Sequence, residues 1–289
     1  MSNYADSHFD EKSQNTSWHK VFSFIQPQSK VLDVGCSSGN FGKVLISKKQ
    51  CTVDGIELDK KDAKEAAKKL HTVRVLDIEK DSLSGLGKNE YDCIYFGDVI
   101  EHLVDPVETL KRIKTLLKNS GAVVFSIPNM GHLSVRLDLL GGKLEATETG
   151  LLDKTHLHFY TQDEVLRVFE EAGYRIDKLD FVKKDYPKQL LEKHLAKLGL
   201  KANEKFYQLM QQTDAAAFQF VGMAVPSTIK KHKLPKFGPV DMFEKFYEDT
   251  KKNYEIEIKR LKNEIKILKY KTAHPYRNIA SRIKGKIRK

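Results

Sequence analysis

The chain has 289 residues, and its 50 Lys and Arg against 39 Asp and Glu give a net charge of +11. Residues 226–289 hold 19 of the Lys and Arg but only 7 of the acids, so the first 225 residues are nearly neutral and lack the charge signature of a nucleic-acid-binding domain. The start of the chain does not resemble a signal peptide, and no apolar run has the length of a membrane span. With three scattered cysteines and no Cys-x-x-Cys pair, we expect a reduced, cytoplasmic protein.

A glycine-punctuated turn follows the first predicted strand. Residues 1–14 are polar and expected to be mobile, and apolar residues at helical spacing predict a helix over Thr16–Ile25. Lys30–Val34 then forms a short apolar strand that leads through a turn into a helix near Phe41. This arrangement binds nucleotide-like ligands in α/β sheets. Neither the third glycine of the dinucleotide fingerprint nor Gly-Lys-Ser/Thr is present, so another adenosine-containing ligand fits better.

Four residues in and before this turn are candidate ligand contacts. Asp33, at the end of the strand, can receive a cationic ammonium but would repel a pyrophosphate. Gly35 and Gly39 allow the backbone to approach a ligand that a Cβ atom would block. We expect Cys36 to be a small side chain packed near the ligand rather than a nucleophile.

Acidic residues also follow the next two predicted strands. Cys51–Ile56 ends in Glu57, about 20 residues beyond the turn, where an acid can accept both hydroxyls of a ribose. Asp59 could share or replace Glu57 in this role, or cap a helix over Lys60–Leu70. Thr72–Leu76 leads to Asp77, which can accept a hydrogen bond from an adenine amino group or act as an ordinary turn acid, and Ile78 could supply an apolar wall.

The alternation of strands and helices continues through the middle of the chain. A fourth strand is predicted over Tyr91–Phe96, a helix over Val107–Leu117, closed by residues 119–121, and a fifth strand over Ala122–Ile127. Five strands alternating with helices indicate an α/β fold with a Rossmann-like, doubly wound, mostly parallel sheet.

The rest of the domain has less regular patterns. Pro128–Leu140 could form a lid hinged at Gly141 and Gly142. The remaining predicted elements are a helix over Gln162–Glu171, a strand over Tyr174–Val182, a helical insertion over Pro187–Gln212 and a last strand over Ala215–Val225.

The motifs together resemble those of the class I S-adenosylmethionine-dependent methyltransferases. The glycine turn is similar to their motif I, and Asp98-Val-Ile-Glu101-His102, followed by Asp105-Pro106 and later Ser-Ile-Pro-Asn129, resembles the branch with the ubiquinone-pathway and small-RNA 2′-O-methyltransferases. The stretches Gly131–Leu140 and Gly150–Thr161 resemble methyltransferases associated with glycosyltransferases in bacterial surface-polysaccharide synthesis. The resemblance covers about residues 8–225 and implies a seven-stranded sheet with an antiparallel last strand.

The same resemblance implies S-adenosylmethionine as the cofactor. The expected cofactor-binding residues are Asp33, Gly35, Cys36, Gly39, Glu57, Asp77, Ile78 and Asp98. Methyl transfer from a sulfonium requires donor and acceptor to be held in line, and a hydroxyl acceptor also needs a general base or a metal ion.

Two interpretations of the acceptor side stay open. The candidate catalytic residues are Glu101, His102, His156 and His158, with Asp98, His132 and Asp153 expected nearby. In the preferred, metal-free interpretation, Glu101 and His102 cap a helix and hydrogen-bond across the site, and His156 or His158 is the base. In the alternative, which the family pattern suggests, Asp98, Glu101, His102 and His156 bind a divalent metal ion.

We therefore predict an O-methyltransferase that acts on a sugar or glycan intermediate of surface-polysaccharide synthesis. One alternative is a lipid-quinone or other small-molecule O-methyltransferase. A second is an RNA 2′-O-methyltransferase, which is less favoured and would bind with a steep salt dependence. A third is a non-catalytic scaffold that binds S-adenosylmethionine.

The residues beyond the predicted methyltransferase domain, 15–225, form an appendage. Residues 226–239 look like a linker, and 240–271 are expected to form a helix whose apolar residues recur at 4-3-4-3 spacing over two clean heptads. Such a helix could form a coiled coil in a homodimer, pack on the domain or bind a partner such as a glycosyltransferase. Residues 272–289 form a basic amphipathic tail that suits the inner face of an anionic membrane, or is simply solvated.

Overall fold

The computed structural model describes residues 9, 13–212, 214–228, 258–262 and 265. The chain divides into two units, residues 1–240 and 241–289. Residues 258–262 and 265, the described part of the second unit, are helical, and Ile258, Leu261 and Ile265 are about half exposed. The predicted mobile start, the linker and the basic tail lie mostly or wholly outside the described residues. Within the described residues, no helix has the length and apolarity to cross a membrane.

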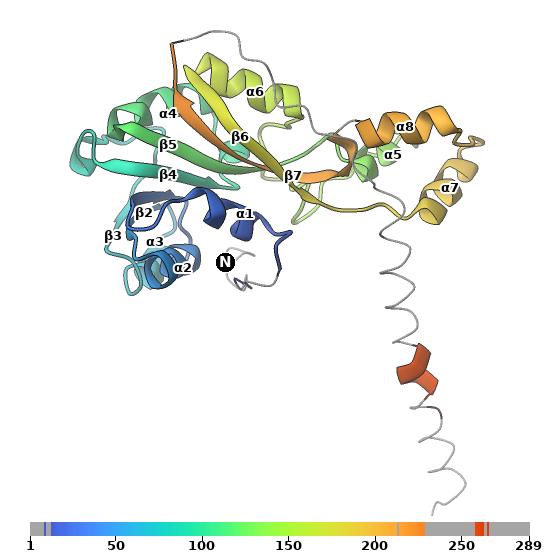
Figure 1. The fold of residues 1–289 in the computed structure, drawn as a ribbon, viewed down its shortest axis with the longest axis horizontal. Helices are drawn as coiled ribbons and strands as arrows, with labels where there is room; N and C mark the ends of the chain where they lie inside the picture. The colour runs from blue at the N-terminus through green and yellow to red at the C-terminus, as the bar shows by residue number, and fades with distance from the viewer. Residues whose placement is uncertain (1–8, 10–12, 213, 229–257, 263–264, 266–289) are drawn as a thin grey trace, which may run out of the picture. The chain divides into compact units, whose positions relative to one another are not determined.

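Seven strands form one sheet in the order β3-β2-β1-β4-β5-β7-β6 (Figure 1). Their bounds are β1 Lys30–Val34, β2 Thr52–Glu57, β3 Thr72–Val75, β4 Tyr91–Gly97, β5 Leu117–Pro128, β6 Tyr174–Lys183 and β7 Ala217–Pro226. The first five strands pair in parallel, whereas β7 is antiparallel to both β5 and β6. The predicted Rossmann-like sheet, with its antiparallel last strand, is confirmed.

Helices cover both faces of the sheet and enclose two apolar cores (Figure 1). One face carries α1 (Ser17–Phe24), α2 (Asn40–Lys49) and α3 (Lys60–Ala66); the other carries α4 (Pro106–Ile113) and α6 (Gln162–Glu171). Side chains alternate between the faces along a strand. Val31 therefore belongs to the core under α1, α2 and α3, and Leu32 belongs to the core under α4 and α6. The other helices are α5 (Leu133–Leu140), α7 (Lys188–Lys197) and α8 (Glu204–Gln212), with short 3₁₀ turns η1 (Ser84–Leu86), η2 (Ile100–His102), η3 (Lys114–Leu116) and η4 (Asp214–Ala216).

The predicted boundary between the helix over Val107–Leu117 and the strand over Ala122–Ile127 was wrong. Instead of continuing to Leu117, α4 ends at Ile113, and β5 begins at Leu117 and includes residues 119–121. Leu117 is 3% exposed and pairs with Tyr91, and Lys118 forms an ion pair of 2.8 Å with Asp92. These pairings with β4 extend the strand over polar residues whose local pattern predicts a turn.

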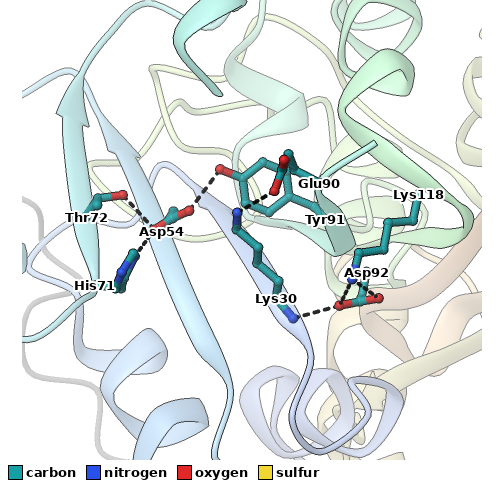
Figure 2. Close-up of polar contacts among 8 residues, drawn as sticks. All are labelled: Lys30, Asp54, His71, Thr72, Glu90, Tyr91, Asp92 and Lys118. Carbon is teal, nitrogen blue, oxygen red and sulfur yellow. Dashed lines mark hydrogen bonds and ion pairs between the residues drawn. The ribbon is translucent and has the colours of Figure 1, made fainter. Parts of the chain in front are cut away.

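A polar network joins the amino-terminal halves of the strands (Figure 2). The buried Asp54 of β2 accepts hydrogen bonds from Thr72 Oγ1 (2.6 Å) and Tyr91 OH (3.0 Å), and its Oδ1 lies 2.8 Å from His71 Nδ1. Beside it, the Lys30 backbone N–H donates to Asp92 (2.9 Å), and its Nζ pairs with Glu90 (2.7 Å). These contacts bind β2, β3, β1 and β4 together at the edge of the sheet opposite the candidate site.

Candidate active site

A cavity of about 450 Å³ opens at the carboxyl ends of β1, β2 and β4. Five carboxylate side chains line it, and no Lys or Arg among the described residues does so. The acids are Asp33, Glu57, Asp59, Asp62 and Asp98. Its size is that of a small-molecule site, and its charge favours a cationic ligand over a phosphate.

Two glycines shape the turn beside this cavity: Gly35 lines the cavity, whereas the predicted contact Gly39 is not among its lining residues. Gly35 has φ +71°, and a Cβ atom there would lie 2.6 Å from Cγ2 of Val99. Gly39 has φ +75° and precedes α2, where a Cβ atom would lie 3.0 Å from the Cα of Ala66. Left-handed backbone and close neighbours both require glycine. The turn predicted from the sequence therefore exists and exposes backbone to the cavity.

Glu57 closes the turn from the end of β2. Its Oε2 accepts a hydrogen bond from the backbone N–H of Ser37 (2.8 Å), and its Oε1 accepts one from that of Asp59 (2.9 Å). Asp59 caps α3 by accepting hydrogen bonds from the N–H groups of Lys61 and Asp62. The capping alternative for Asp59 is thus observed, and Glu57 is the acid fixed against the turn.

Asp33 and Cys36 both line the cavity and are nearly inaccessible. Asp33 is 3% exposed, and its burial, with the nearby Glu57 carboxylate, raises its pKa to about 8. Burial, followed by the charges of Asp33 and Glu57, raises the pKa of the Cys36 thiol. A thiol with a raised pKa is a poor nucleophile at neutral pH, which agrees with the expected packing role.

The structure does not bring Asp77 and Ile78 to the wall of this cavity. The Asp77 carboxylate accepts hydrogen bonds from the backbone N–H of Glu79 (2.9 Å) and from Lys80 Nζ (2.9 Å). Ile78 is 6% exposed and belongs to the apolar core. Their roles beside an adenine stay predictions.

Next to the cavity lie three side chains that we call the Glu101 cluster: Glu101, His102 and His156. One potential ligand atom from each lies within 4.8 Å of the other two. The two imidazole rings meet edge to face with centroids 4.9 Å apart. Hydrogen bonds join the segment around Glu101 and His102 to the segment around His156. His102 Nδ1 lies 3.1 Å from the Thr155 carbonyl, and the backbone N–H groups of Leu157 and His158 donate to the Glu101 backbone carbonyl.

Within this cluster the carboxylate of Glu101 is buried. The residue is 1% exposed, and neither carboxylate oxygen has a hydrogen-bond partner among the residues that the structure describes. Burial and then the charges of Asp98 and Asp153 hold its pKa well above the ordinary range. Burial and the neighbouring His102 lower the pKa of His156. A buried carboxylate without a partner is costly, and a cation between it and two imidazoles would remove that cost.

The other predicted catalytic residues lie outside this cluster. His158 Nε2 is 3.3 Å from the Val104 carbonyl, and Asp153 accepts hydrogen bonds from the N–H and hydroxyl of Thr155. His132 caps α5, and its Nε2 is 3.0 Å from the Lys184 carbonyl, so both ring nitrogens have structural partners. Asp98, the fourth residue of the proposed metal set, lines the cavity but is not part of the cluster.

Sequence reasoning missed the aromatic wall of the cavity. Trp18 of α1 and Phe41 of α2 have ring centroids 5.3 Å apart, and Phe41 and Tyr95 of β4 have centroids 5.0 Å apart. All three line the cavity. Their spacing in the sequence is that of ordinary core residues, so no local signal sets them apart.

The family-model match and the similarity to curated proteins indicate one family. Residues 9–179 match the family model described as "Methyltransferase domain". The chain is 29% identical over 156 residues to the ubiquinone biosynthesis O-methyltransferase of Thiobacillus denitrificans, covering 52% of this chain and 66% of that protein. It is also 29% identical over 157 residues to the protein of the same name from Nitrosospira multiformis, covering 52% and 64%. The chain thus spans just under two thirds of the length of these curated relatives.

A solved structure shares the fold. The SAM-dependent methyltransferase of Archaeoglobus fulgidus aligns with a TM-score of 0.53 at 19% identity, over 74% of this chain and 94% of that one. At this identity, the alignment supports the fold alone.

Proposed function

Because the chain belongs to the methyltransferase-domain family, whose class I members use S-adenosylmethionine, we propose that it transfers a methyl group from this cofactor to a hydroxyl oxygen of a small molecule. The observation that carries the proposal is the position of His102. This residue lines the cavity and also belongs to the Glu101 cluster. Groups able to bind a cation or a proton therefore adjoin the space that the cofactor would fill.

The charge of the cavity supports the choice of cofactor. S-adenosylmethionine carries a sulfonium and an ammonium, and the cavity presents carboxylates from Asp33, Glu57 and Asp98. We assign the ribose hydroxyls to Glu57, whose carboxylate the backbone of the turn already orients. Asp33 lies at the end of β1, where it would meet the ammonium directly or through water.

The unpartnered carboxylate supports a divalent cation in the Glu101 cluster, ahead of the metal-free alternative. Glu101, His102 and His156 would hold the ion, and carboxylate with imidazole suits Mn²⁺ or Zn²⁺. A cation bound there would lower the pKa of an acceptor hydroxyl. In the metal-free alternative, His156 would take the proton itself, because its lowered pKa keeps the imidazole neutral.

For the acceptor we propose a phenolic hydroxyl of the lipid-quinone type, ahead of a sugar. The relatives named above are ubiquinone biosynthesis enzymes. Apolar side chains in the two segments of the Glu101 cluster are more than half exposed: Val104, Leu157 and Phe159. They would contact an apolar part of the acceptor. A phenol ionises near pH 10, which is within reach of a weak base.

The test is methyl transfer from S-adenosylmethionine, followed by mass spectrometry of the acceptor. A simple phenolic diol, 3,4-dihydroxybenzoate, is compared with a nucleotide sugar, each with Mn²⁺ or with EDTA. We expect methylation of the diol that Mn²⁺ stimulates. Glu101→Gln should remove this stimulation, whereas the same change at the exposed Glu145 should not.

Other outcomes select other functions. Transfer to the nucleotide sugar alone would favour the surface-polysaccharide acceptor. Equal rates in Mn²⁺ and EDTA would favour the metal-free base. Cofactor binding without transfer to either acceptor would favour a non-catalytic scaffold.

A further inference from the structure

We propose that Gln219 and Ser126 are positioning residues that turn Asp98 toward the cofactor cavity and keep it out of the Glu101 cluster. The inference rests on the proposed function, because it assigns Asp98 to the positive charge of S-adenosylmethionine. It gives β7, which pairs with β5 on the side away from β4, a direct part in building the site.

The backbone of Asp98 is held in an unfavourable conformation. Asp98 follows directly after β4 and has φ +56°, in the left-handed region that residues with a Cβ atom rarely adopt. Its N–H donates to the carbonyl of Ser126 on β5 (3.1 Å). Such strain persists only where surrounding contacts enforce it, most often at functional sites.

The two oxygens of the Asp98 carboxylate have different surroundings. Oδ1 accepts hydrogen bonds from Ser126 Oγ (3.2 Å) and from Gln219 Nε2. Oδ2 has no hydrogen bond from the described residues, and Asp98 lines the cavity. One oxygen is therefore anchored, and the other is left for a ligand.

Gln219 is out of place in its strand unless it serves this contact. It is the one polar side chain between residues 217 and 225, in a strand that otherwise supplies apolar residues to the core. It lies in register between Pro128 of β5 and Val182 of β6. An apolar residue would satisfy the sheet equally well, so the amide is explained by its bond to Asp98.

The anchoring also separates the Asp98 carboxylate from the Glu101 cluster. The ligand atoms of Glu101, His102 and His156 converge, whereas Asp98 is held by β5 and β7 outside that group. The sequence suggested a metal set of Asp98, Glu101, His102 and His156. In the structure, Asp98 lies outside the cluster that the other three residues form. Asp98 lines a cavity with no Lys or Arg among the described residues, so a cationic ligand is the natural partner of its Oδ2.

The experiment is calorimetric titration of the full-length protein with S-adenosylmethionine. The set comprises wild type, Gln219→Leu, Asp98→Asn and the double variant, with Gln189→Leu on the exposed face of α7 as the control. Loss of one hydrogen bond to a charged group predicts affinity about tenfold weaker for Gln219→Leu. The double variant should lose no more than Asp98→Asn alone, which a merely structural role would not produce.

Two further probes separate the cavity from the cluster. The neutral 5′-methylthioadenosine lacks the sulfonium and the ammonium, so Gln219→Leu should leave its affinity unchanged. Mn²⁺ affinity should also be unchanged in Gln219→Leu and Asp98→Asn. Should Gln219→Leu fail to fold, Ser126→Ala replaces it, with a smaller loss in the same direction.

The inference fails if Gln219→Leu binds S-adenosylmethionine as wild type does, if the losses of the single variants add in the double variant, or if Asp98→Asn weakens Mn²⁺ binding tenfold. In those cases wild type still binds the cofactor and the proposed function stands. Absence of binding to wild type would overturn both.

Discussion

At the scale of single residues, Asp33 links the cavity to pH. Its carboxyl group is 3% exposed, and burial together with Glu57 raises its pKa to about 8, so at pH 7 most free molecules carry it protonated. A bound cation nearby favours the ionised form and lowers that pKa. Binding of S-adenosylmethionine below pH 8 should therefore release a proton from Asp33.

We predict that the affinity for S-adenosylmethionine rises between about pH 6 and pH 8 and levels off above. With a pKa of about 8, Asp33 must lose its proton to bind the cation below this pH, and it is already ionised above it. Calorimetry in two buffers of different ionisation enthalpy measures the released proton. Asp33→Asn should abolish both the proton release and the pH dependence. An affinity that is flat over this range in wild type would show that no cation meets Asp33.

How far the sequence predicts a site residue depends on how local its partners are. Glu57 bonds to Ser37, 20 residues away in an adjacent strand-and-turn unit, and the strand pattern is sufficient to anticipate both. His102 and Thr155 are 53 residues apart, and Asp98 and Gln219 are 121 apart. Sequence motifs identify Asp98 and His102 as candidates, but whether their side chains meet these distant partners depends on the tertiary packing. The left-handed φ of Asp98 has no sequence signal, because aspartate is not a residue that requires it.

At the scale of elements, the polar network around Asp54 stabilises the sheet opposite the site (Figure 2). Burial alone would raise the pKa of Asp54, but hydrogen bonds from Thr72, His71 and Tyr91 lower it overall. The ionised group therefore contributes stability at neutral pH, and this contribution is lost as acid protonates it.

Tyr91→Phe removes the buried donor to Asp54 Oδ2 and leaves that oxygen unsatisfied. We predict a loss of about 1–3 kcal/mol in the free energy of unfolding, measured by urea denaturation. Tyr207→Phe is the matched control, because its hydroxyl bonds to Glu192 at the surface, and a loss below about 0.5 kcal/mol is expected. Equal effects of the two changes would rule out a special contribution of the network.

Element boundaries show where local patterns fail. The strands β1, β2 and β4 match their predicted ranges to within about a residue, because buried parallel strands are short apolar runs. The predicted start of β5 was wrong because the strand extends over polar residues. These residues are held against β4 by the pairing of Leu117 with Tyr91 and by the ion pair of Lys118 with Asp92. The predicted insertion over 187–212 is two helices, α7 and α8, separated at Gly199, whose φ is +71°.

At the scale of the whole molecule, charge is divided between two regions of the sequence. The cavity is lined by carboxylates, whereas the excess of Lys and Arg lies in residues 226–289. A membrane, protein or homodimer contact of that basic region stays a prediction, since almost all of it lies outside the described residues. The fold was predictable because the strand and helix alternation leaves few topologies, and the family resemblance selects one.

The acid-lined cavity at the carboxyl ends of β1, β2 and β4 is the site where we propose that S-adenosylmethionine binds. The most direct test of this proposal is calorimetric titration of wild type, Glu57→Ala and the exposed control Glu145→Ala. We predict saturable binding to wild type and to the control, and an affinity roughly 10- to 100-fold weaker for Glu57→Ala, as expected for loss of charged hydrogen bonds to the ribose. No binding to a folded wild type, or equal binding to all three proteins, would contradict the assignment of this cavity to S-adenosylmethionine.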